Sequence, residues 1–459
     1  MAEYVQEQQK NTLNLQDKLM ISSGTFSAFF IRQGVGVLAI PYYQMTLAVD
    51  PFLLAAAMMI PLLLASLLGP WVGQFSDACQ QKYGHRRPFI VFGALITAIC
   101  YGAIWQVPVG WQGENQLVYF TIAYSLFCIA AEFFLIPYIC LVYEATDSSQ
   151  ERVNLLALNS IVGKVCSLIY QWAFPLAQMS LFGGLFMGIK WVGWGIAIIF
   201  IALAGMLPAF WQQSTHTSRS EYVPASKPPR DLIKNLDQVL ANPAFVLLLL
   251  ITFSQYFISV YAASMDYYLI VYYMQAGELA DGAYWKGIVS TAYAGFGLLS
   301  VPLILKLVSS YGRLNGFIIV YLITALGGAV KWFVYTPGAE YWLFLDAMLG
   351  CVVWASMAIL LHSLVADTAA NKAIHSTNLN GVFVSVHNIV TQLCISGAML
   401  FSGFTLNQIN FDAQLGGQQS ASTIVAMRVI LSIGTVLSAV LALVAIYRLK
   451  KYQRLIGNG

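Results

Sequence analysis

Residues 69–93, GPWVGQFSDACQQKYGHRRPFIVFG, join two strongly apolar segments through a short charged turn. The first segment ends in Ser76 and Asp77, and apolar sequence resumes directly after Pro88. Such a charged hairpin is typical of two adjacent membrane helices, with its cations holding the turn on the cytoplasmic side. Asp77, at a helix end, is expected to pair with an arginine across the turn.

The composition excludes an ordinary soluble domain. The 459 residues are 59% hydrophobic and 9% charged, which leaves too few charges to cover a soluble surface. The net charge of +3 comes without a basic stripe, so no nucleic-acid partner is expected. The seven cysteines show no CxxC spacing, which argues against disulfides and a metal site. We therefore predict a multi-pass membrane protein that is not an enzyme and holds no metal or other cofactor.

Apolar segments of about 20 residues, the length that crosses a bilayer as a helix, recur twelve times. No cleavable signal precedes the first of them. The predicted spans are residues 20–46, 52–76, 89–107, 117–143, 153–179, 187–212, 244–274, 284–308, 315–335, 341–366, 379–406 and 421–448. The fold class is accordingly an all-α membrane protein with twelve transmembrane helices.

A long polar connection, residues 213–243, separates two sets of six spans. It predicts an N-terminal half over 1–212, a cytoplasmic linker over 213–243 and a C-terminal half over 244–459. The halves also echo each other, because Tyr83-Gly84-His85-Arg86 follows the second span and Tyr311-Gly312-Arg313 follows the eighth. Such similarity indicates two six-helix pseudo-repeats of one transporter fold.

The distribution of cations predicts the orientation. With the N-terminus inside, most lysines and arginines of the connections fall on the cytoplasmic side, and the outer connections carry mainly Asp and Glu. We expect a monomer in the cell membrane with both termini cytoplasmic.

Three ionisable residues are predicted near the middle of spans: Arg32 in the first, Glu132 in the fourth and Lys164 in the fifth. A charge inside the bilayer is costly and by default marks a cavity or a transport pathway. Glu132 and Lys164 are equally far along the chain from the loop between their helices, so we expect them to face each other at one depth. The alternative is a structural ion pair.

Both residues belong to polar stripes at helical spacing. One stripe comprises Thr121, Ser125, Cys128 and Glu132, and the other comprises Ser160, Lys164, Ser167 and Gln171. Two such stripes on adjacent helices predict one wall of a wet cavity, whereas hydrogen bonding between helices is the alternative.

The C-terminal half offers a second polar set. Gln255 and Asp266 lie on the seventh span, where Asp266 is either an outer gate residue or a solvated helix end. His387, Asn388 and Gln392 on the eleventh span provide the donors and acceptors that hydroxyl-rich ligands need. His387 is either a proton carrier or a buried neutral member of a polar network.

Aromatic and terminal residues admit simpler roles. Tyr42, Tyr43, Trp172 and Trp354 could supply stacking surface for a sugar. Lys331, near a span end, is expected to extend its ammonium toward the interface.

The pattern Gly-Pro-x-x-Gly-x-x-Ser-Asp followed by Gly-x-Arg-Arg-Pro-Phe resembles the loop between the second and third helices of the major facilitator superfamily. It looks most like the glycoside-pentoside-hexuronide:cation symporters and the plant sucrose/proton symporters. Ile136-Pro137-Tyr138 after span four and Ala366-Asp367-Thr368 after span ten extend the similarity. The resemblance implies the major facilitator fold and transport of sugars or glycosides with sodium or protons.

The resemblance also implies a charge network that closes the cytoplasmic side. Its members would be Asp77, Arg86, Arg87, Glu144, Arg152 and Asp367.

The chain departs from the family at the cation site of the melibiose-permease type. The carboxylate positions of spans two and four correspond to Ala65, Gly69 and Leu135, and the pair Arg32-Gln33 lies one turn beyond the first-span positions. A sodium site needs several oxygen ligands, which these residues do not supply. Proton coupling through Glu132 is therefore expected over sodium coupling.

The predicted function is secondary active transport of a sugar or glycoside, by proton symport with alternating access. The substrate and coupling set comprises Arg32, Gln33, Glu132, Lys164, Gln171, Gln255, Asp266, His387, Asn388 and Gln392. The alternatives are a facilitator, a carrier of another small, anionic or amphipathic solute, and a nutrient sensor that binds without transporting.

Overall fold

The structure is a computed structural model that describes residues 13–83, 86–108, 110–111, 113–146, 149–211, 239–370 and 380–457. Every regular element within these residues is a helix. The chain forms two compact units, Met1–Tyr222 and Val223–Gly459, which are considered separately below. Most of the predicted linker, 213–243, lies outside the described residues, so its boundaries stay a prediction.

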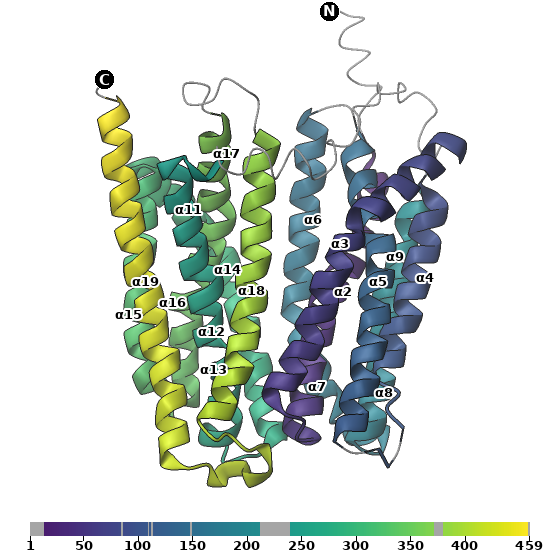
Figure 1. Cartoon of the computed structure of the whole chain (residues 1–459), viewed down its shortest axis with the longest axis vertical. Coiled ribbons are helices and arrows are strands. Elements are labelled where there is room, and N and C mark those ends of the chain that lie inside the picture. The colour runs from purple at the N-terminus through teal and green to yellow at the C-terminus, as the bar shows by residue number, and fades with distance from the viewer. Residues whose placement is uncertain are drawn as a thin grey trace, which may run out of the picture. The chain divides into compact units, whose positions relative to one another are not determined.

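The first unit is built from long helices with short π- and 3₁₀-helical insertions (Figure 1). Its elements are α2 (Leu15–Ala39), η1 (Ile40–Thr46), α3 (Pro51–Tyr83), α4 (Arg87–Ile104), α5 (Glu114–Glu144), α6 (Ser149–Ile169), η2 (Tyr170–Trp172), α7 (Ala173–Ala177), η3 (Ser180–Phe182), α8 (Leu185–Gly195), η4 (Ile196–Leu203), α9 (Ala204–Met206) and η5 (Leu207–Phe210).

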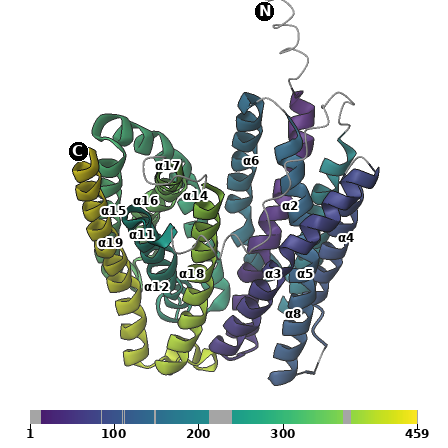
Figure 2. The same cartoon turned by 45° about the horizontal axis from the view of Figure 1, so that its top comes forward.

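The second unit has the same character, as the two views in Figures 1 and 2 show. Its elements are α11 (Pro243–Phe253), η6 (Ser254–Ser259), α12 (Val260–Ala263), α13 (Met265–Tyr268), η7 (Leu269–Met274), α14 (Leu279–Tyr311), α15 (Arg313–Val334), η8 (Glu340–Trp342), α16 (Leu343–Ser356), η9 (Met357–Leu361), α17 (His362–Ala370), α18 (Asn380–Gln408), η10 (Ala413–Gln418) and α19 (Ala421–Gly457).

The lengths and hydropathy of these helices fit a bilayer. Eleven helical spans of the described residues are long and apolar enough to cross a membrane, and α3 contributes a shorter apolar stretch, Pro51–Ala65. The predicted all-α membrane fold is thus confirmed.

The turn in the opening motif begins later than predicted. Asp77 was expected at a helix end, but α3 continues without interruption to Tyr83. The sequence between them contains neither glycine nor proline, so nothing stops the helix before Gly84.

Close helix packing fixes α5 in the first unit. A Cβ atom at Gly93 of α4 would stand 2.5 Å from the Phe133 carbonyl oxygen, so only glycine lets the two backbones approach this closely. Glu132 is the preceding residue on α5 and is thereby held at a defined register.

Aromatic side chains fill the interior at one end of the first unit. Tyr42 and Tyr43 are 2% and 0% exposed, and the Tyr43 hydroxyl donates to the Ile104 carbonyl oxygen at 2.8 Å. The Tyr43 ring also packs on Phe120, with the ring centroids 4.7 Å apart. Both tyrosines are core residues, so the prediction that they offer stacking surface to a sugar is wrong.

The core of the second unit joins helices that are distant in sequence. Phe245 of α11 packs edge to face on Phe383 of α18, with ring centroids 4.8 Å apart. Phe317 and Tyr321 of α15 belong to the same buried cluster. In this unit α11 packs against both α18 and α19, and α19 packs against α15.

Candidate functional site

Glu132 lies within the α5 span, partly buried and directed toward α3. Its Oε2 atom is 3.9 Å from the position that a Cβ atom would occupy at Gly69. The carboxyl group therefore lies against a glycine, the smallest possible neighbour. In the sequence, this glycine, Gly69, corresponds to a carboxylate position of the melibiose-permease type.

Arg32 of α2 is the basic residue whose electrostatic field acts on the Glu132 carboxyl. The predicted Glu132–Lys164 pair is not among the ion pairs that the described residues form. The physical reason is helix neighbourhood, because α6 packs mainly against α2 and only slightly against α5. Equal depth along two consecutive helices does not make their side chains face each other.

The other candidates of the first unit are distributed around α2. Arg32 and Gln33 are exposed, and Lys164 and Gln171 are partly exposed. Phe29 of α2 packs edge to face on Tyr170, with ring centroids 5.4 Å apart, which brings the turn containing Gln171 against α2.

The hydroxyls in the predicted stripes bond along their own helices. Ser125 donates to the Thr121 carbonyl oxygen at 2.6 Å, and Ser167 donates to that of Lys164 at 2.7 Å. These bonds occupy each donor hydrogen but leave oxygen lone pairs free to accept.

Asp266 forms an ion pair that the sequence did not predict. Both of its carboxylate oxygens lie 2.7 Å from the Lys286 Nζ of α14. The two side chains are 21% and 16% exposed. The pair belongs to membrane-length helices, and the Lys286 ammonium also lies 5.9 Å from the centre of the Tyr267 ring.

A second ion pair in the same unit is almost completely buried. Lys331 Nζ lies 2.7 Å from Asp346 Oδ1, and the side chains are 9% and 1% exposed. The other carboxylate oxygen, Oδ2, accepts hydrogen bonds from Tyr293 at 3.1 Å and Tyr335 at 3.0 Å. The expectation that the Lys331 ammonium reaches the interface is wrong, because Asp346 binds it inside the unit.

Gln255 and His387 are buried in the second unit. Gln255 lies in the π-helical turn η6, and its amide nitrogen donates to the Ser259 hydroxyl at 3.3 Å. His387 Nε2 is 3.1 Å from the Thr252 hydroxyl, and its ring packs edge to face on His362. This environment favours the interpretation of His387 as a member of a polar network.

Asn388 and Gln392 lie one helical turn apart on α18, and both are exposed. Trp354 of α16 is 40% exposed and packs edge to face on Tyr256, with ring centroids 5.9 Å apart. These groups keep the accessible donors, acceptors and aromatic face that a hydroxylated ligand requires.

The predicted cytoplasmic network is described only in part. Arg86 is buried and donates to the Ser76 hydroxyl at 2.8 Å, and Arg87 donates to the Trp211 carbonyl oxygen at 2.8 Å. Asp367 pairs with Arg313. The side chains of Asp77, Glu144 and Arg152 lie outside the described residues, so their gating role stays a prediction.

Three charged residues of the second unit were missed in the sequence: Lys286, Asp346 and Arg428. The Arg428 guanidinium lies 4.4 Å from the centre of the Trp332 ring and donates to the Trp332 carbonyl oxygen at 2.5 Å. All three fall inside predicted spans, within a few turns of a span end. The rule for ionisable residues in membranes could have found them had it been applied along the whole span.

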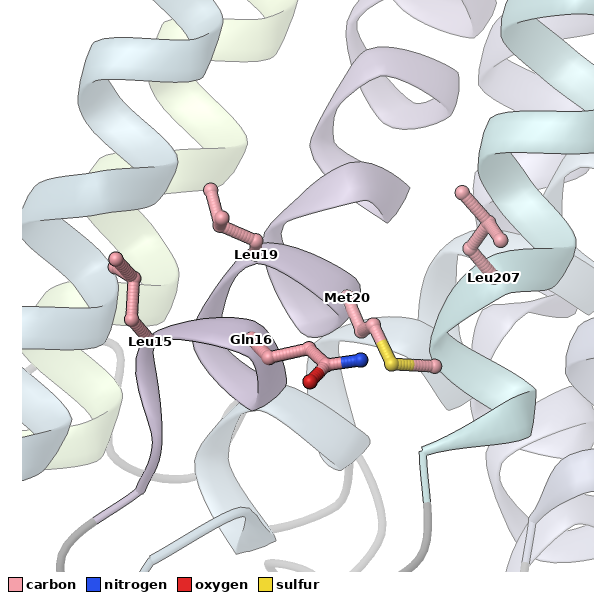
Figure 3. A pocket seen from close by; sticks show the side chains of 5 residues that line it. All are labelled: Leu15, Gln16, Leu19, Met20 and Leu207. Carbon is pink, nitrogen blue, oxygen red and sulfur yellow. The ribbon is translucent and has the colours of Figure 1, made fainter.

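An apolar pocket lies apart from these groups, where the beginning of α2 faces η5 (Figure 3). It is lined by Leu15, Gln16, Leu19, Met20 and Leu207. Its lining contains none of the candidate residues.

Membrane-length helices in two compact units, each holding ionisable side chains within its spans, define a secondary transporter of the major facilitator type. The chain belongs to the MFS/sugar transport protein family, whose sequence pattern matches residues 20–452. Within it, the chain resembles the glycoside-pentoside-hexuronide:cation symporters, so the predicted recognition is confirmed.

Relatives and solved structures agree with this assignment. YagG of Escherichia coli (strain K12), whose name assigns it provisionally to the glycoside/cation symporters, is 22% identical over 410 residues, covering 87% of this chain and 84% of YagG.

Two solved structures share the fold. A bacterial homologue of the human lysosomal transporter Spinster gives a TM-score of 0.66 at 15% identity, covering 95% of this chain and 97% of the homologue. A D-xylose-proton symporter gives 0.60 at 13% identity, covering 93% and 96%. The family and these relatives are transporters rather than enzymes.

Proposed function

We propose that the chain is a proton-coupled symporter of a sugar or glycoside that works by alternating access. The observation that carries the proposal is the position of Glu132, a mid-span carboxyl group with no ion-pair partner among the described residues. A charge inside the bilayer is costly without a bonded counter-ion, and binding a proton removes that charge. The names of YagG and of the D-xylose-proton symporter support the substrate class and the coupling ion.

Arg32 is the residue that we propose to tune Glu132. When water access or the Arg32–Glu132 distance changes during the cycle, the proton affinity of the carboxyl group changes with it. Glu132 can then take up a proton on one side of the membrane and release it on the other.

Both termini are proposed to be cytoplasmic, which places residue 81 inside. Labelling of Gln81→Cys in sealed cells by an impermeant thiol reagent would contradict this orientation.

The proposal is tested with Glu132→Gln in proteoliposomes. Radiolabelled D-xylose, melibiose, sucrose and D-glucuronate are offered with and without a pH gradient, alkaline inside, and separately with a sodium gradient. The variant should exchange substrate across the membrane but fail to accumulate it. The matched control is Glu114→Gln, since Glu114 is exposed at the beginning of the same helix. Proton-driven accumulation by Glu132→Gln would overturn the role of Glu132.

One observation favours a second candidate, a carrier of an anionic solute. The polar set of the first unit holds two cations, Arg32 and Lys164, against the single carboxyl group of Glu132. An excess positive charge attracts anions. Transport of D-glucuronate, with no transport of the neutral sugars, would decide for this candidate.

A further inference from the structure

The second unit contains two lysine–aspartate pairs that differ in access to solvent. The Asp346–Lys331 pair is closed, because the carboxylate is 1% exposed and its two oxygens bind one lysine and two tyrosines. The Asp266 carboxylate binds Lys286 alone among the described residues, and 21% of its side chain is exposed.

The exposure of the Asp266–Lys286 pair indicates contact with water. Both residues belong to membrane-length helices, and an ion pair that faced hydrocarbon would carry a large desolvation cost. The exposed parts of the two side chains are therefore expected to face water.

The pair has hydrogen-bonding capacity left over. A carboxylate offers about four lone-pair positions, and the Lys286 ammonium occupies two of them, one on each oxygen. An ammonium group has three hydrogens, so one remains after it binds both oxygens. The pair is also neutral overall, which makes it selective against a charged ligand.

We propose that Asp266 and Lys286 form a substrate subsite that binds hydroxyl groups of a neutral, polyhydroxylated solute. Two adjacent hydroxyls donate to the free lone pairs of Asp266, and a ligand oxygen accepts from Lys286. Tyr293 lies on α14 about two turns from Lys286 and donates to Asp346 at 3.1 Å, so α14 carries a residue of each pair. The inference rests on the proposed transport function and adds a substrate contact in the second unit.

The first experiment measures access without requiring a known substrate. Lys286→Cys is treated from both sides of proteoliposomes with a charged methanethiosulfonate reagent, and the labelling of the wild type gives the background. Ala283→Cys is the matched control, because Ala283 lies about one turn away on α14 and is 1% exposed. Labelling of Lys286→Cys but not of Ala283→Cys supports the subsite. Equal, background-level labelling of both overturns it.

The second experiment separates a ligand contact from a structural ion pair. Asp266→Asn should raise the half-saturating concentration for counterflow of whichever sugar of the panel is transported by about ten- to a hundredfold. Asp281→Asn, an exposed change on α14, should leave it unchanged. The double variant Asp266→Lys with Lys286→Asp restores an ion pair, but it exchanges the positions of the carboxylate and the ammonium that the ligand would contact. Normal half-saturation in the exchanged variant would overturn the subsite.

Failure of the transport proposal gives a different result. If the wild type moves no sugar of the panel, the proposed function falls, while labelling at Lys286→Cys still decides whether the pair faces water. If the wild type does transport and Asp266→Asn leaves its half-saturating concentration unchanged, the subsite alone is overturned.

Discussion

Glu132 of the first unit and Asp346 of the second are both membrane-embedded carboxyl groups, but their surroundings differ completely. Asp346 is held by groups from α14, from α15 and from the residue that follows α15. Glu132 lies against Gly69, and the basic residue whose field acts on it is Arg32. Three bonded partners hold the Asp346 carboxylate in place, whereas no ion pair of the described residues holds Glu132.

The difference shows that two arrangements can offset the desolvation free energy of a buried carboxylate. Asp346 is compensated by direct bonds, which stabilise one arrangement of the helices. Glu132 lacks such direct bonds among the described residues, which suits the proton exchange proposed for it. Intramembrane charge alone therefore does not identify a coupling residue, and the number of bonded partners is the better guide.

The largest effect on stability is expected at the closed pair. Lys331→Met leaves Asp346 as a buried charge without its cation, so the free energy of unfolding should fall by about 3–5 kcal/mol. Lys331→Met combined with Asp346→Leu removes both charges and should recover much of the loss. Thermal unfolding of the purified protein in detergent measures both, with exposed Lys306→Met as the control. If Lys331→Met were as stable as Lys306→Met, Asp346 would need its bonded cation no more than Glu132 does.

A smaller effect is expected at the two tyrosines. Tyr335→Phe or Tyr293→Phe removes one hydrogen bond to the Asp346 carboxylate, which should lower the free energy of unfolding by about 1.5–3 kcal/mol each. Tyr447→Phe is the control, since Tyr447 is 67% exposed. In the same unfolding assay, two variants as stable as Tyr447→Phe would show that the tyrosine hydrogen bonds to Asp346 do not stabilise the fold.

Glu132→Gln should have little effect on stability. The change removes a costly charge and breaks no ion pair of the described residues, so the free energy of unfolding should stay the same or rise by about 1 kcal/mol or less. Denaturation in detergent under identical conditions tests this expectation. A loss as large as that of Lys331→Met would make Glu132 a structural residue.

The smallest effect is expected at the Arg313–Asp367 pair, whose side chains are 48% and 55% exposed. Exposed ion pairs contribute about 0–1 kcal/mol and are screened by salt. Arg313→Ala should therefore shift the unfolding transition slightly in low salt and not at all in high salt. A large, salt-independent shift would show that exposure does not govern the strength of these pairs.

Helix positions could be predicted from sequence because each span must cover the bilayer with apolar residues. The ends of the helices were less predictable, as α3 shows by continuing through the polar residues after Asp77. Hydropathy marks where the membrane ends, and it does not fix where the backbone leaves the helical conformation.

The types of residue in the candidate site were predictable, but their pairing was not. Glu132 and Arg32 were found because ionisable residues near mid-span are rare. Lys164 was wrongly paired with Glu132, because α6 packs mainly against α2 and only slightly against α5, which sequence spacing does not encode. Lys286 and Asp346 were missed because they lie nearer the span ends than the mid-span residues considered, yet Asp346 finds its partners inside the unit.

Gly69 has a consequence for how such carriers diverge. A Cβ atom there would be 3.4 Å from Ile136 Cδ1 and 3.9 Å from Glu132 Oε2, both ordinary contact distances, so the helix pair accepts a larger residue. Every glycine codon becomes an aspartate or glutamate codon through one base change at its second position. A lineage of this transporter is therefore a single nucleotide away from placing a second carboxylate beside the first, the beginning of a site that could hold a metal cation in place of the proposed proton.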